Sequence, residues 1–165
     1  MSQLIVTSSL PDLSLGDEEL VFGNFRLLRD AATAGRTCTP LSGKRVALLC
    51  EDETTPEAVV FRYAAEGLGA YVANVRLSVC EQSTDEFVRD FSRMLGLLYD
   101  AAECKGMPQD LLRRVRKGTD IPIYGDLSSS SRCQTALLNK RFHADWSEES
   151  QRLILQAMLV STIDH

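Results

Sequence analysis

Histidine and paired cysteines are almost absent from this chain. Among its 165 residues the only histidines are His143 and His165. The five cysteines are an odd number, and no two of them have the Cys-x-x-Cys spacing. A histidine-rich metal centre is therefore excluded, and a Ser-His-Asp hydrolase would depend on His143 alone. Free thiols favour a reducing compartment over a disulfide framework or a zinc site, so we expect a cytoplasmic protein without metal or cofactor.

Long apolar runs and clustered positive charge are missing as well. No uninterrupted apolar stretch reaches the roughly 18 residues of a membrane-spanning helix, and residues 1–12 lack the basic start and apolar centre of a secretory signal. The net charge is -5, whereas nucleic-acid binding needs clustered lysine and arginine. We therefore expect no membrane and no nucleic acid among the partners. One basic run is present and is interpreted as a solvated helix face: Arg113, Arg114, Arg116 and Lys117.

Short apolar segments alternate with helical patterns along most of the chain. Pro56 and Gly69 stand where a helix would begin and end, with Thr54 or Thr55 as its N-terminal cap. Because parallel strands need long crossovers, this alternation predicts a four-stranded parallel sheet in a three-layer α/β domain, with sites at the carboxyl ends of its strands. The expected strands are 45–50, 70–76, 99–104 and 121–124, and the expected helices are 18–34, 56–68, 83–98 and one starting at Pro108.

Two helices carry more detailed predictions. Ser83 and Glu86 have the spacing of a capping box, and so do Asp145 and Glu148 ahead of the final helix. That final helix should be amphipathic and should dock back on the domain, closing the fold, and residues 132–140 also look helical. The helix that follows Ser83 is expected to gather its apolar side chains on one side: Phe87, Phe91, Met94, Leu95 and Leu98.

Residues 46–70 read VALLCEDETTPEAVVFRYAAEGLGA. They resemble the first signature region of the carbamoyltransferases, above all of ornithine carbamoyltransferase. In that family an apolar strand and an acidic turn precede Ser-Thr-Arg-Thr-Arg, then Ser-Phe-Glu and an alanine-rich helix. Residues 89–106 resemble the family's third strand with its lead-in helix, and residues 121–127 its fourth strand. The resemblance extends to about Leu138 and implies the fold of the family's carbamoyl-phosphate-binding domain, over about 1–142.

The resemblance fails at the residues that carry the chemistry. In the family, Ser-Thr-Arg-Thr-Arg binds the phosphate of carbamoyl phosphate through backbone N–H groups at a helix N-terminus and through its arginines. Here the hydroxyl positions are Thr54 and Thr55, but the arginine positions are Pro56 and Ala58, with Glu57 between them. Pro56 lacks the N–H that a phosphate would use, and Glu57 adds negative charge where a dianion would lie.

Two later motifs also lack residues that bind the substrate in the family. The arginine of the family's Tyr-Arg-Gly corresponds to Lys105, which keeps the charge without the guanidinium fork. The family's His-Pro-Thr-Gln corresponds to residues 131–134, where Ser131 replaces the histidine and only Gln134 matches. The family's second domain, which binds the amino-acid substrate, has no counterpart, and residues 151–162 resemble its last helix. We therefore expect one domain joined to a returning helix, about 146–163, with the second substrate domain absent.

These departures predict a catalytically inactive carbamoyltransferase-like protein with no catalytic residues. Because the family trimerises through this domain, the resemblance implies a structural or regulatory role, as a homo-oligomer or with an intact carbamoyltransferase. A small-molecule or anion-binding module is one alternative, and an enzyme with unrelated new chemistry is another. Thr54 and Thr55 are otherwise simple helix caps, and Lys105 a solvated charge. The crevice of such a module would be lined by Thr54, Thr55, Lys105, Arg132 and Gln134.

Overall fold

The middle of the protein is a four-stranded parallel sheet, as predicted, and its strand order is β2-β1-β3-β4. The computed structural model describes residues 15–127 and 147–163. β1 pairs in parallel with both β2 and β3, and β4 pairs in parallel with β3. The elements are α1 (Leu15–Thr33), β1 (Arg45–Leu49), α2 (Pro56–Gly67), β2 (Tyr71–Val75), α3 (Asp85–Leu98), β3 (Ala101–Cys104), α4 (Gln109–Lys117), β4 (Ile123–Gly125) and α6 (Glu148–Ile163).

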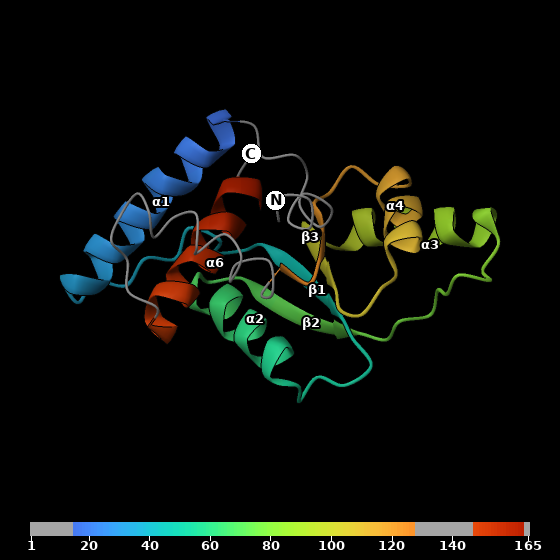
Figure 1. The fold of residues 1–165 in the computed structure, drawn as a ribbon, viewed down its shortest axis with the longest axis horizontal. Helices are drawn as coiled ribbons and strands as arrows, with labels where there is room; N and C mark the ends of the chain where they lie inside the picture. Colours follow the sequence, from blue (N-terminus) through green and yellow to red (C-terminus); the bar gives the residue numbers. More distant parts are fainter. Residues whose placement is uncertain (1–14, 128–146, 164–165) are drawn as a thin grey trace, which may run out of the picture.

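Helices cover both faces of the sheet, which confirms the three-layer prediction (Figure 1). Val46 and Leu48 of β1 pack in a core with α1, α2 and α6. Ala47 and Leu49 point the other way and pack in a core with α3 and α4. Successive strand residues alternate between faces, so a strand that is apolar at every position needs cover on both sides.

The final helix, α6, is buried on nearly all of its sides. Every residue from 153 to 161 is less than a tenth exposed. α6 lies between α1 and α2 (Figure 1), where Asn24 Nδ2 donates to Ser161 Oγ at 3.0 Å and Gln156 Nε2 donates to the carbonyl oxygen of Ala64 at 3.0 Å. The predicted docking is confirmed. The predicted amphipathic pattern is wrong, because a helix that packs against two others at once needs apolar residues around most of its circumference.

The capping residues of two helices differ from the sequence prediction. α3 begins at Asp85, with Thr84 as its cap: Thr84 Oγ1 accepts from the backbone N–H of Phe87 at 3.2 Å. Ser83 instead accepts from the N–H of Cys80 at 3.0 Å, within the preceding turn. α6 begins at Glu148, where Ser147 Oγ accepts from the N–H of Ser150 at 3.2 Å. The capping residue therefore lies one or two positions after the predicted one, since a nearby hydroxyl takes the role.

The buried side of α3 is narrower than predicted. Phe91 and Leu95 are buried, together with Val88 and Ser92. Phe87, Met94 and Leu98, which were expected inside, are 48%, 37% and 49% exposed. Residues three and four apart share a helix face, so the stripe through Val88, Phe91 and Leu95 faces the sheet and leaves its flanks outside.

The remaining differences are small. The fourth strand covers Ile123–Gly125 rather than 121–124, and the third begins two residues later than expected. The predicted helix at 132–140 and the capping residue Asp145 lie outside the described residues. None of the helices in the described ranges is long and apolar enough to cross a bilayer.

Candidate functional site

The carboxyl edge of the sheet, where all four parallel strands end, brings together the loops after β1 and β3. The chain leaves β1 through α2 to β2 on one side, and then crosses over β1 to β3 on the other. The backbone N–H of Lys105 donates to the carbonyl oxygen of Leu49 at 2.8 Å, which joins the two strand ends. In open parallel sheets this reversal of strand order is the usual ligand site. The candidate site is therefore built on residues 50–58 and 103–107.

Thr54 and Thr55 both use their side chains locally. Asp52 Oδ1 accepts from the hydroxyl and, at 2.9 Å, from the backbone N–H of Thr54. These two hydrogen bonds, the hydroxyl one foremost, lower the pKa of Asp52 and keep it ionised. Thr55 is the N-cap of α2, and its Oγ1 accepts from the N–H of Ala58 at 3.3 Å. Both hydroxyl groups thus hold the loop in place.

The N-terminus of α2 has few backbone N–H groups that could bind an anion. Pro56 is its first residue and has no N–H, as predicted. The N–H groups of Ala58 and Val59 donate to the side chain and carbonyl oxygen of Thr55. Glu57 contributes a negative charge in the first turn. The N–H groups of Ala58 and Val59 are therefore already used within the helix start, and acidic groups flank it.

A polar cluster that sequence reasoning missed connects this loop to α2 and β2. Asn74 Nδ2 donates to Glu53 Oε2, and the Arg62 guanidinium donates to Asn74 Oδ1. Arg62 also lies 3.9 Å from Glu53 Oε2. The three residues come from a helix, a strand and a loop, so no local spacing in the sequence predicts that they lie together.

Lys105 is directed inward rather than into solvent. Its side chain is only 10% exposed, and its Nζ lies 3.9 Å from Oδ1 of Asp126. Asp126 has a positive φ of 54° in the turn after β4, a conformation that asparagine and aspartate tolerate better than most residues. The positive charge at this edge is therefore partly compensated within the protein.

Glu103 lies beside Lys105 and is fully buried. Burial raises the pKa of Glu103 from its usual 4.5 to about 7, while the positive charge of Lys105 opposes that rise. Both of its carboxylate oxygens are 3.1 Å from the backbone nitrogen of Leu127, whose N–H they share. An acid within the apolar strand Ala101–Cys104 is a signal in the sequence that points to this residue, although it was not among the predicted site residues.

The two thiols closest to the candidate site, Cys50 and Cys104, are not activated. Burial raises the pKa of Cys50, and the neighbouring Glu53 carboxylate raises it further. Burial also raises the pKa of Cys104 far above its usual value. A nucleophilic cysteine needs the opposite shift. In the described part of the chain, no group of three His, Cys, Asp or Glu side chains could hold a metal ion.

Of the predicted crevice residues, Thr54, Thr55 and Lys105 lie at this edge. Arg132 and Gln134 lie outside the described residues, so the crevice as a whole stays a prediction. Two arginines of the basic run on α4 are hydrogen-bonded to neighbouring backbone groups. The Arg114 guanidinium donates to the carbonyl oxygen of Ser83 at 2.6 Å, and Arg116 Nε donates to that of Ile123 at 3.0 Å.

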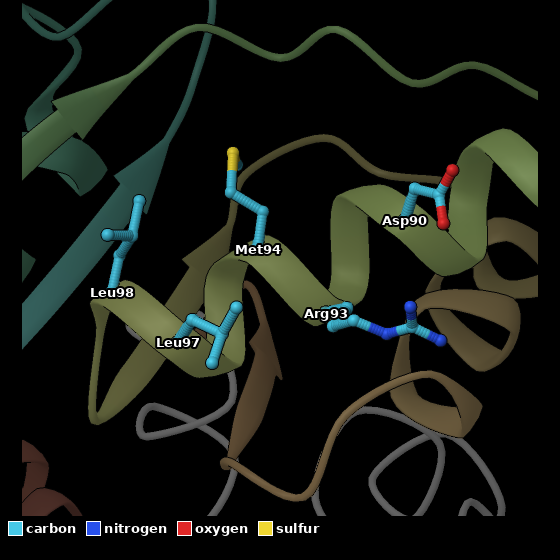
Figure 2. Close-up of a pocket in the computed structure, with 5 residues that line it drawn as sticks. All are labelled: Asp90, Arg93, Met94, Leu97 and Leu98. Carbon is cyan, nitrogen blue, oxygen red and sulfur yellow. The ribbon is translucent and has the colours of Figure 1, made fainter.

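A second exposed feature lies on α3. Figure 2 shows five side chains following one another along the helix, around a shallow pocket of about 360 Å³. Leu97 is 79% exposed, and the neighbouring Met94 and Leu98 are also accessible. We call this surface the α3 patch: Asp90, Arg93, Met94, Leu97 and Leu98.

Comparison with known proteins connects this fold to one family of enzymes, although no protein-family model matches the sequence. Ornithine carbamoyltransferase of Actinobacillus pleuropneumoniae is 30% identical over 103 residues, which are 62% of this chain and 31% of that enzyme. The catabolic ornithine carbamoyltransferase of Mycoplasma capricolum is 31% identical over 104 residues, 63% of this chain and 33% of the enzyme.

Solved structures agree on the fold. Ornithine carbamoyltransferase from Burkholderia thailandensis superposes with a TM-score of 0.65 at 18% identity, over 81% of this chain and 48% of that one. The catalytic subunit of M. jannaschii aspartate transcarbamoylase superposes with a TM-score of 0.58 at 16% identity, over 81% of this chain and 46% of that one. The homologues of this chain are thus ornithine and aspartate carbamoyltransferases, and it spans about a third of the length of the curated relatives it matches.

Proposed function

We propose that this homologue of ornithine and aspartate carbamoyltransferases does not transfer carbamoyl groups and acts as a structural or regulatory protein that self-associates. The observation that carries the proposal is the N-terminus of α2. In the family resemblance this is the phosphate-binding position, and here Thr55 caps it, Pro56 removes an N–H and Glu57 adds a negative charge.

The charges of the residues at this position disfavour the binding of a phosphate. A unit charge about 5 Å from another interacts with about 3 kcal/mol at an effective dielectric constant near 20. Exchanging two arginines for Pro56 and Ala58, and a threonine for Glu57, therefore turns several kcal/mol of attraction into repulsion. Lys105 does not replace them, since Asp126 already lies 3.9 Å from its amino group.

Self-association is supported by the α3 patch. Large apolar side chains that stay exposed together are typical of surfaces that contact another protein. The partner would be further copies of this chain or an intact carbamoyltransferase.

Calorimetric titration with carbamoyl phosphate tests the loss of the phosphate site. We expect no binding heat at millimolar concentration for the natural chain. A triple variant with Pro56→Arg, Glu57→Thr and Ala58→Arg restores the family's residues and should produce measurable binding. Tight binding by the natural chain would contradict the proposal.

A small-molecule or anion-binding module is the second candidate, favoured by Lys105. Its positive charge lies at the carboxyl edge, at the position where the family resemblance has an arginine that contacts the anion. If this candidate is correct, Lys105→Met should abolish binding of the anion and leave the oligomeric state unchanged. If the structural role is correct, substitutions in the α3 patch should change the oligomeric state.

A further inference from the structure

A separate pocket of about 240 Å³ lies where α1, α2 and α6 meet. It is bordered by the last turns of α1 and α2 and by the first turns of α6. The end of α2 leads directly into the start of β2, where the N–H of Tyr71 donates to the carbonyl oxygen of Lys44. The pocket is therefore at the amino edge of the sheet, away from the carboxyl edge where the family resemblance places carbamoyl phosphate.

Among the described residues, two arginines and no acidic side chain line this pocket. Arg36 lies in the loop after α1, and Arg152 lies in the first turns of α6. Within the described ranges, neither guanidinium group forms a hydrogen bond or an ion pair, although several other arginines do. In a protein of net charge -5, two uncompensated cations on one pocket produce a local positive potential.

The floor of the pocket is apolar. Leu28 and Ala31 of α1 and Leu153 of α6 line it, and the two leucines are only 7% and 6% exposed. The ring of Tyr63, which is 66% exposed, stands at its side. An inorganic anion would use only the arginines and a hydrocarbon only the floor, so the pocket as a whole suits a molecule with both parts.

Gln156 supplies an acceptor to the same pocket. Its Nε2 donates to the carbonyl oxygen of Ala64 at 3.0 Å, which fixes the amide. A Cβ on Gly67 would lie 2.9 Å from that nitrogen, so glycine at this position leaves room for the amide. Every fully buried side-chain polar atom in the described part has a partner. The oxygen of Gln156 accepts from no described donor and is therefore not fully buried, and Gln156 lines the pocket.

We propose that this pocket binds a small organic carboxylate. Its carboxylate lies between Arg36 and Arg152, whose planar donor forks match carboxylate geometry. Its aliphatic body covers Leu28 and Leu153, and a hydroxyl or amide N–H on the ligand donates to Gln156. The volume is below the roughly 300 Å³ at which pockets for drug-sized ligands begin, which limits the ligand to a short chain.

Titration of the isotope-labelled full chain, followed by nuclear magnetic resonance, tests this proposal with three probes: hexanoate, hexan-1-ol and inorganic phosphate. Hexanoate should shift the resonances of Tyr63, Gly67 and Gln156 saturably. The alcohol and phosphate should bind at least about tenfold more weakly, because each meets only half of the site. Added salt should weaken the binding of hexanoate and leave that of hexan-1-ol unchanged.

Arg36→Gln and Arg152→Gln should each weaken hexanoate binding about tenfold, as expected for one charge-assisted hydrogen-bonding partner. Both side chains are exposed, so the variants should keep the circular dichroism spectrum of the natural chain. Arg89→Gln is the matched control, because it removes the same charge from an exposed position on α3. The proposal is overturned by an absence of saturable shifts with hexanoate, by phosphate binding as tightly as hexanoate, or by an equal loss in the Arg89 control.

Discussion

The carboxylate of Glu103 in β3 holds the backbone N–H of Leu127, two residues after β4, at 3.1 Å from each oxygen. This contact connects the end of β4 to the neighbouring strand β3 through a carboxyl group whose pKa is raised by burial. Because the pKa of Glu103 is raised to about 7, the stability of the fold depends on pH near neutrality.

The direction of that dependence follows from proton linkage. The folded protein binds the proton of Glu103 more tightly than the unfolded chain, in which the pKa is close to 4.5. The contribution of Glu103 to the free energy of unfolding is therefore largest below pH 4.5. This contribution is lost as the pH rises through about 7. A shift of this size corresponds to about 3 kcal/mol.

Glu103→Gln tests this linkage. Gln keeps an acceptor for the N–H of Leu127 but cannot ionise. We expect the variant to match the natural chain at pH 5 within about 1 kcal/mol, and to exceed it by about 2–3 kcal/mol at pH 8, from urea denaturation at both values. A difference that does not change with pH would show that Glu103 titrates normally.

Removing the cap of α2 should destabilise the protein modestly. Thr55→Ala deletes the oxygen that accepts from the N–H of Ala58, and we expect a loss of about 1 kcal/mol in the free energy of unfolding. Thr54→Ala is the control, because Thr54 is exposed and caps no helix; its cost should be smaller. Equal costs for the two threonines would contradict the assignment of Thr55 as the cap.

The α3 patch should control self-association. Leu97→Asp places a charge on the most exposed apolar side chain of α3 and should weaken association at least about tenfold in sedimentation velocity. Leu27→Asp makes the same change at a position on α1 that is 67% exposed and should leave the oligomeric state intact. A natural chain that sediments as a monomer at high concentration would remove the basis for the structural role.

Gly125 at the end of β4 should not tolerate a side chain. A Cβ there would lie 2.5 Å from Cδ2 of Leu112, which is fully buried and has little room to move. Gly125→Ala should therefore cost about 1–3 kcal/mol, measured by urea denaturation. Gly23→Ala is the counterpart, because a Cβ at that helical position meets nothing within 4 Å. That change should stabilise the protein by about 0.5–1 kcal/mol.

Sequence patterns correctly predicted those parts of the fold that depend on residues close together in the sequence. The continuous apolar run of β1 and the Pro56 start of α2 each depend on neighbouring residues, and both are found where expected. The sidedness of α3 was mispredicted, because five apolar residues span more of its circumference than the sheet covers.

The contacts at the candidate site have a different origin. Glu103 and Leu127 are 24 residues apart in the sequence, and Glu53 and Asn74 are 21 apart. Such pairs are set by the register of parallel strands and by the crossovers between them, which no short spacing encodes. A buried acid in an apolar strand is the one local signal from which part of the site could have been inferred.

The residues at the start of α2 have a consequence beyond ligand binding. A threonine cap, a proline in the first position and a glutamate in the first turn are each among the most favourable choices for beginning a helix. Binding sites as a rule cost stability, because they hold groups in arrangements that the fold alone would not choose. With Thr55, Pro56 and Glu57 in this position, the start of α2 strengthens the domain without any bound partner.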